Sequence, residues 1–214
     1  MAFTAMDVKA LREKTGVGMM ECKKALTEAD GDMDKAIDFL RERGLAAAEK
    51  KSARIAAEGV VYTYYDEAAK KAVTVEVNSE TDFVAKNDKF MDFVKGVART
   101  IIATAPADVE ALCATGFDGT DRTVTETLND LILAIGENMK IRRFEVMDGV
   151  VATYIHAGGS VGVMVGFDVA DESKAATDEF KVMGKDVAMQ IAALNPRFWD
   201  KTQVTQDVLD EEKK

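Results

Sequence analysis

The sequence predicts an α+β fold in which a three-helix bundle precedes two copies of a small strand–strand–helix unit, the second copy incomplete. Residues 1–45 contain three stretches with apolar residues at helical spacing, and residues 58–106 recur as residues 148–196. Residues 1–56 carry 11 basic and 10 acidic side chains, whereas the rest of the chain carries 17 and 28, and such asymmetry indicates separate modules. The expected organisation is a three-helix domain over 1–45, a helical linker over 46–57, a first core subdomain over 58–147 and a second over 148–214.

The predicted bundle is defined by its helix ends. Thr4 followed by Asp7 is typical of a capping box, and the first helix is expected to stop at Gly16. The second helix should end at Gly31 and the third, with apolar residues at i, i+3, i+4 and i+7, at Gly44. The Ala- and Lys-rich stretch that follows favours a helix with few core residues.

The start of the second helix carries two methionines. Helical spacing places Met19 in the core beside Cys22 and leaves Val17 and Met20 nearer the surface. This segment has two interpretations, ordinary core packing or an exposed apolar knob, since flexible methionine suits contact surfaces.

The repeat is detected by sliding the sequence on itself by 90 residues. Without gaps, residues 58–106 match their counterparts at 16 of 49 positions, where chance gives roughly three from ordinary residue usage. A repeat of this length indicates a duplicated structural unit, so we assign the same fold to both copies before considering single elements. The matched pairs include Gly59/Gly149, Val60/Val150, Tyr64/Tyr154, Phe90/Phe180, Val97/Val187, Ile101/Ile191 and Pro106/Pro196.

Each copy is predicted as two strands and a helix. The alternating apolar residues of 72–77 and 162–168 indicate the second strands, which follow strands over 59–65 and 149–155. Between the copies, a capping box at Thr123 begins a helix that ends at Gly136. A strand over 140–147 follows, and Asp148 and Gly149 are expected to turn it into copy two.

Copy two is expected to be incomplete. The counterparts of 124–147, which supply the last helix and third strand of copy one, would fall near 214–237. Residues 202–214 are predicted to begin a helix.

The composition excludes several classes of function. With 28 basic and 38 acidic residues the net charge is −10, which argues against broad nucleic-acid or anionic-membrane binding. No run of 18 apolar residues and no signal-like start is present. Two cysteines and the single His156 leave little metal, cofactor or acid–base chemistry. We therefore expect a cytoplasmic protein that is not an enzyme, needs no cofactor and acts by contact.

The two copies differ most at residues 79–85 and 169–175. Copy one has Phe83 and Val84 directly after Asp82, whereas copy two has a polar turn there. One interpretation is that Ser79 or Thr81 caps a helix and Phe83 enters the core as a staple. The other is a protruding wedge that enters a partner, with Asp82 beside it.

These residues carry a resemblance to a known family. The run Thr81-Asp82-Phe83-Val84-Ala85 resembles the TDFVA signature of bacterial elongation factor Ts, and residues 11–32 resemble the ubiquitin-associated-like N-terminal domain of that family. Residues 135–143 and 153–165 are also similar to family segments. The family is the guanine-nucleotide exchange factor for elongation factor Tu, which implies that GDP-bound elongation factor Tu is the partner.

The resemblance implies three groups of contact residues. The wedge beside the partner's magnesium ion would comprise Thr81, Asp82, Phe83 and Val84. Docking on the partner's nucleotide-binding domain would use Lys9, Arg12, Met19 and Met20. Core contacts would come from Ile135, Gly136 and His156. Complete relatives also carry a helical hairpin and a C-terminal module that have no counterpart here, so we expect no homodimerisation through a coiled coil and weaker binding.

Two other functions stay open at this point. An enzyme would use Asp82 or Glu80 as a general acid or base with His156 nearby, although the sequence has no phosphate loop or nucleophile motif. An adaptor would use the bundle, like a ubiquitin-associated domain, to bind partners without exchange activity.

Overall fold

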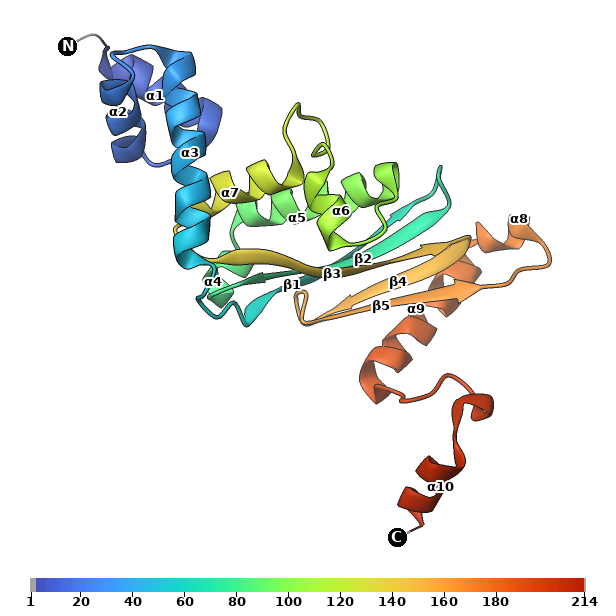
Figure 1. Ribbon diagram of the computed structural model, residues 1–214. Helices are drawn as coiled ribbons and strands as arrows, with labels where there is room; N and C mark the ends of the chain where they lie inside the picture. Colours follow the sequence, from blue (N-terminus) through green and yellow to red (C-terminus); the bar gives the residue numbers. More distant parts are fainter. Residues whose placement is uncertain (1–2, 214) are drawn as a thin grey trace.

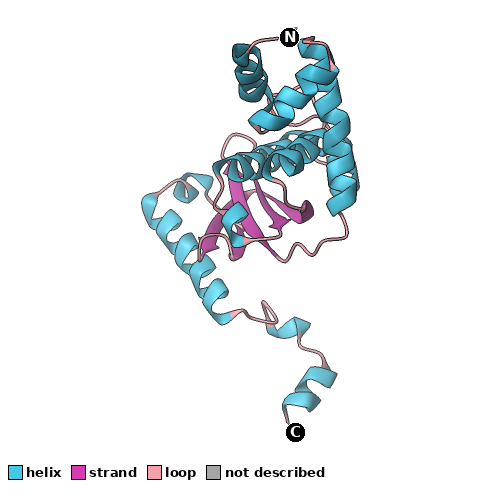
Figure 2. Cartoon of the chain, turned by 90° about the vertical axis from the view of Figure 1, so that its left-hand side faces the viewer, coloured by secondary structure: helices cyan, strands magenta, loops and turns pink. Residues whose placement is uncertain are grey.

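The computed structural model describes residues 3–213 and has an α+β fold (Figure 1). Three N-terminal helices precede a layered core in which helices cover one face of a three-stranded sheet and a two-stranded hairpin covers the other (Figures 1 and 2). The N-terminal helices are α1 (Ala5–Thr15), α2 (Met19–Glu28) and α3 (Met33–Lys51). The α+β class predicted from the sequence is confirmed.

The bundle forms its own small core. The predicted capping box is present, since Thr4 accepts from the Asp7 amide and the Asp7 carboxylate accepts from the Thr4 amide. Gly16 ends α1 in the left-handed conformation, with φ 71°, which costs glycine no strain. The buried apolar residues are Val8, Leu11, Val17, Cys22, Ala25, Leu26, Ala29, Ala36 and Leu40.

The prediction that the third helix ends at Gly44 is wrong. Helix α3 continues to Lys51, so residues 46–51 of the expected linker belong to it, whereas residues 52–54 form a turn and residues 55–57 have no regular secondary structure. Gly44 is buried against α7 (Val124–Ile135), where a Cβ atom would lie 3.3 Å from the carbonyl oxygen of Asn129. The glycine therefore permits a close helix–helix approach and does not end the helix.

The three-stranded sheet has the order β1-β2-β3 and is antiparallel throughout. Its strands are β1 (Glu58–Asp66), β2 (Lys71–Ser79) and β3 (Met139–Asp148), close to the predicted ranges. In the register, Ser79 pairs with Glu58 on one side and with Met139 on the other. The end of β2 and the starts of β1 and β3 therefore meet at one end of the sheet.

Helices α5 (Asp88–Thr104), α6 (Val109–Ala114) and α7 pack on one face of this sheet. The central strand β2 is covered on both faces, since the neighbouring residues Ala72 and Val73, which point to opposite faces, are both fully buried. The predicted capping box of α7 is present at Thr123 and Glu126, and the helix ends at Gly136, with φ 92°. The main core of the molecule lies in this layer.

The second sheet is the antiparallel hairpin of β4 (Val150–His156) and β5 (Val161–Phe167), which packs on the opposite face of the first sheet. Glycine allows the close approach: a Cβ atom at Gly162 would lie 2.5 Å from Val61 Cγ1. The chain turns from β3 into β4 at Gly149, with φ 94°, as expected, but the two strands do not pair as a hairpin, because β3 pairs with β2 and β4 pairs with β5. The Gly149 amide instead donates to the carbonyl of Lys70, and the chain passes into the neighbouring sheet.

Helix bounds in the second half recur at the 90-residue offset of the sequence repeat. Helices α4 (Asp82–Ala85) and α5 correspond in this way to α8 (Glu172–Ala175) and α9 (Asp178–Leu194). Both long helices also end on a left-handed residue, Ala105 and Asn195. The last elements are a 3-10 turn over Lys201–Gln203 and α10 (Gln206–Glu212), in line with the helix predicted there.

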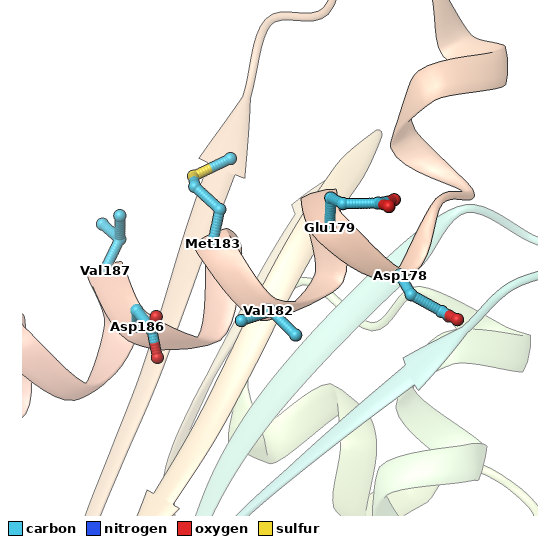
Figure 3. Close-up of a pocket in the computed structure, with 6 residues that line it drawn as sticks. All are labelled: Asp178, Glu179, Val182, Met183, Asp186 and Val187. Atoms are coloured by element: carbon cyan, nitrogen blue, oxygen red, sulfur yellow. The ribbon is translucent and has the colours of Figure 1, made fainter.

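Helix α9 differs from α5 in its outer face. Val182, Met183 and Val187 are 59, 40 and 37% exposed, and together with Asp178, Glu179 and Asp186 they line an open surface hollow along the helix (Figure 3). In α5, by contrast, Phe93 and Val97 at the positions of Met183 and Val187 are buried. The two helices thus share their bounds but not their surroundings.

Candidate functional site

The end of the sheet where β2 stops collects most of the residues singled out from the sequence. Helix α4 begins three residues after Ser79, and Ile135 and Gly136 lie just before the start of β3. The β4–β5 hairpin reaches the same region, because the carbonyl of Gly159 accepts from the Val61 amide at 2.7 Å. The register of the sheet therefore brings together segments that lie far apart in the chain.

Helix α4 presents neighbouring side chains to opposite environments. Val84 is 5% exposed and belongs to the main core, whereas Phe83 is 80% exposed. The staple interpretation of Phe83 is therefore wrong, since its ring does not enter the core. The buried Val84 therefore anchors α4 in the core and leaves the ring of Phe83 accessible from solvent.

Asp82 lies at the first position of α4. Its carboxylate accepts from the Lys86 ammonium at 2.9 Å. The Lys86 side chain is the main reason that the pKa of Asp82 lies below its usual value. Asp82 is thus a charged, exposed group next to Phe83, without the raised pKa of a general acid.

The turn before α4 is held by contacts from a distant segment. Thr81 occupies the N-cap position but its side chain makes no capping bond. Its amide and hydroxyl instead donate to the two carboxylate oxygens of Glu137, at 3.0 and 2.8 Å. Ser79 does not cap the helix either, because its hydroxyl donates to the carbonyl of Thr81. The predicted capping role of Ser79 or Thr81 is therefore wrong.

Residue Glu137 and its neighbour Asn138 were not singled out from the sequence. The Asn138 amide donates to the Glu80 carboxylate, and its side chain donates to the carbonyl of Arg54 at 2.7 Å. The available signal was two polar residues between a helix-ending glycine and a strand. Because such residues usually face solvent, only the fold reveals their partners.

The methionines at the start of α2 are exposed, Met20 by 67% and Met19 by 42%. The expectation that Met19 faces the core and Val17 the surface is wrong, since Val17 is 1% exposed. Helical spacing applies only from Met19 onward, and the first residue of a helix has no preceding turn for its side chain to cover. The exposed-knob interpretation therefore describes this segment.

Two basic residues lie on the neighbouring helix α1. Lys9 and Arg12 are both exposed, and Lys9 forms an ion pair with Glu13 at 3.7 Å. An exposed pair of this kind contributes little to stability. Both side chains are thus available to a partner.

The remaining predicted contact residues lie near the end of the sheet. Ile135 is half-buried against the main core, and Gly136 is exposed. His156 ends β4, is exposed, and has its Nδ1 atom 3.0 Å from the Tyr154 hydroxyl. These positions offer surface for contact and no enclosed site.

The arrangement offers little support for catalysis. The Glu80 carboxylate is occupied by Asn138 and Arg54, Asp82 by Lys86 and His156 by Tyr154. Among residues 3–213, no group of three or more potential ligands is placed to hold a metal ion. Within the same range, no helix combines the length and apolar character needed to cross a membrane. The exposed apolar side chains are the feature that remains to be explained.

Comparisons with known proteins agree with the resemblance. The family model described as Elongation factor TS matches residues 80–214. Elongation factor Ts of Clostridium novyi (strain NT) is 50% identical over 98% of this chain and 69% of its own length. The proteins of the same name from Clostridium perfringens (strain SM101 / Type A) and Trichlorobacter lovleyi are 52% and 49% identical, over 98% and 100% of this chain and 69% and 70% of their own lengths.

Proposed function

Because the chain belongs to the elongation factor Ts family, the guanine-nucleotide exchange factors of elongation factor Tu, we propose that it releases GDP by inserting Phe83 and Asp82 beside the magnesium ion of its partner. The protein forms no covalent intermediate and is not an enzyme. Thr81 and Val84, the other two residues of the predicted wedge, hold the turn from which Phe83 and Asp82 project.

The observation that carries this proposal is the 80% exposure of Phe83 beside the buried Val84. A GTPase holds GDP through phosphate contacts and magnesium, so a wedge that fits only the opened site competes with the nucleotide. The coupling is reciprocal: bound nucleotide weakens the wedge as much as the wedge weakens the nucleotide. A negative Asp82 near the magnesium ion also alters the local charge balance.

The size of the effect requires further contacts. Burying a phenylalanine contributes roughly 1.5–3 kcal/mol, and each tenfold loss of nucleotide affinity needs about 1.4 kcal/mol. Phe83 alone therefore accounts for a loss of nucleotide affinity of about ten- to a hundredfold. In the proposal, the docking surface of Lys9, Arg12, Met19 and Met20 and the contacts of Ile135, Gly136 and His156 supply the rest.

Several finer expectations belong to the same proposal. The bundle is of the ubiquitin-associated type, and the core is a duplication with copies over 58–147 and 148–214, supported by the 90-residue offset of the helix bounds. The factor acts in the cytoplasm, where translation takes place, binds GDP-loaded elongation factor Tu and no nucleic acid, and does not dimerise through a coiled coil.

The wedge is tested by following the release of fluorescent GDP from elongation factor Tu. At saturating factor, Phe83→Ala should slow GDP release by about 10- to 100-fold, because the ring is no longer there to be buried in the partner. Trp199 is equally exposed, at 80%, and lies in the C-terminal part of the chain. Trp199→Ala is therefore the matched control and should release GDP at the parental rate. Full acceleration by Phe83→Ala would refute the wedge.

A further inference from the structure

The turn that carries Phe83 is held partly by residues that lie far from it in the sequence. Helix α4 has four residues and lacks a side-chain cap, and so short a helix has no stability of its own. On its N-terminal side, the position of the turn depends on residues outside it, chiefly Glu137 and Asn138. These two residues, which we name the Glu137–Asn138 clamp, come from the segment between α7 and β3.

We propose that the Glu137–Asn138 clamp positions Phe83 for nucleotide exchange. The inference rests on the proposed wedge and assigns a role to residues that do not themselves reach the nucleotide. The clamp fixes the direction in which the exposed ring leaves the protein. A ring held in its binding direction avoids the ordering cost that a mobile turn would have to meet on binding.

The chemistry of the clamp suits this role. Both carboxylate oxygens of Glu137 accept from Thr81, one from the amide at 3.0 Å and one from the hydroxyl at 2.8 Å. Two parallel bonds to a charged acceptor restrain orientation as well as distance. Thr81 gives up the usual capping bond of its position to make them, so its hydroxyl serves the clamp and not the helix.

Copy two provides an internal comparison. Its short helix α8 begins after Asp171, whose carboxylate accepts from the Ser173 amide at 3.0 Å and so caps the helix locally. The residue at the position of Phe83 is Ser173, so no apolar side chain projects there. A local cap holds the turn that carries no wedge, whereas a clamp from 56 residues away holds the turn that does.

Asn138 extends the clamp to the segment that follows α3. Its side chain is buried, with 6% exposed, and donates to the carbonyl of Arg54. The Arg54 guanidinium in turn lies 3.5 Å from the Glu80 carboxylate that accepts from the Asn138 amide. The chain leaving the bundle and the residue before Thr81 are therefore both tied to Asn138.

The experiment measures GDP release from elongation factor Tu over a range of factor concentrations. Glu137→Ala should lower the saturating rate about tenfold, because fewer molecules hold Phe83 in its competent direction. The concentration that gives half the saturating rate should stay within about twofold, since the surface of the bundle is unchanged. A lower saturating rate with an unchanged thermal midpoint distinguishes positioning from loss of the fold.

Thr81 allows a second test with less perturbation. Thr81→Val removes only the hydroxyl, whereas Thr81→Ser retains it, so the serine variant should release GDP several-fold faster than the valine variant. Asp171→Ala loosens the equivalent turn of copy two and should leave release at the parental rate. Equal rates for the serine and valine variants would contradict the clamp.

A double variant separates the clamp from the wedge. If the clamp acts through Phe83, adding Glu137→Ala to Phe83→Ala should slow release no further, because coupled residues are not additive. If Glu137→Ala slowed release equally in the parental protein and in Phe83→Ala, it would act independently of Phe83, and the clamp would be refuted. Slow release by Phe83→Ala with full release by Glu137→Ala refutes the clamp and leaves the wedge standing. Full release by Phe83→Ala refutes both.

Discussion

At the scale of single residues, α4 separates two roles that lie side by side in the sequence. Val84 fills the main core, and Phe83 next to it stays in water. The sequence could not decide between them, because one helical turn has no periodicity to indicate its inward face. The contrast with copy two favours a wedge, because Ser173 and Lys174 replace the two apolar residues there.

The free energy of unfolding should depend on Val84 and hardly on Phe83, whereas the rate of GDP release should depend on Phe83. Val84→Ala removes buried methyl groups and should lower the free energy of unfolding by about 2 kcal/mol. Phe83→Ala should change it by less than about 0.5 kcal/mol, since the ring contributes little to the core. Denaturant unfolding of both variants measures this difference. A large loss of stability in Phe83→Ala would mean that slow release reports damage to the fold.

At the scale of elements, most strand ranges and helix caps could be predicted from the sequence, whereas contacts between distant elements could not. The ranges of β1, β2 and β3 and the caps of α1 and α7 agree with the pattern, because hydrophobic alternation and capping residues act locally. The sequence predicts a helix end at Gly44, whereas the structure shows that a glycine is needed there because α7 packs closely against α3. The link between Glu137 and Thr81 spans 56 residues, so no local pattern could indicate it.

Helices α5 and α9 provide a matched pair for testing how the burial of a residue sets its contribution to the free energy of unfolding. Val97 and Val187 are the same residue at the same place in the repeat, but Val97 is fully buried and Val187 is 37% exposed. Val97→Ala should cost about 2 kcal/mol in unfolding free energy, and Val187→Ala less than about 0.5 kcal/mol. Chemical denaturation of the two variants checks this. Equal losses would mean that the outer face of α9 is covered in solution.

At the scale of the whole molecule, the bundle is fixed to the core mainly by the packing of α3 on α7. Helix α3 lies against α7 (Figures 1 and 2), and Gly44 is buried where the two helices meet. Leu133 of α7 packs against the bundle core, and the Lys89 ammonium of α5 donates to the carbonyl of Gly16 at 2.8 Å. These contacts set the position of the exposed methionines relative to Phe83, so the two surfaces can engage one partner together.

A side chain at Gly44 should uncouple these two surfaces. A Cβ atom there already lies 3.3 Å from the Asn129 carbonyl, so Gly44→Leu forces α3 away from α7. The docking surface is then misplaced while Phe83 keeps its clamp. We expect the factor concentration for half-maximal GDP release to rise about tenfold, equivalent to about 1.4 kcal/mol of docking energy, with the saturating rate retained within about twofold.

The matched control for this prediction lies two residues further along the same helix. Ala46 is exposed, so Ala46→Leu adds the same side chain without meeting α7 and should leave both exchange parameters unchanged. If Gly44→Leu instead lowered the saturating rate and left the half-maximal concentration unchanged, α3 would act on the wedge through Asn138 and not through placement of the bundle. The ratio of the two parameters therefore distinguishes docking at a distance from positioning of the wedge, because the first changes binding and the second changes the step that follows it.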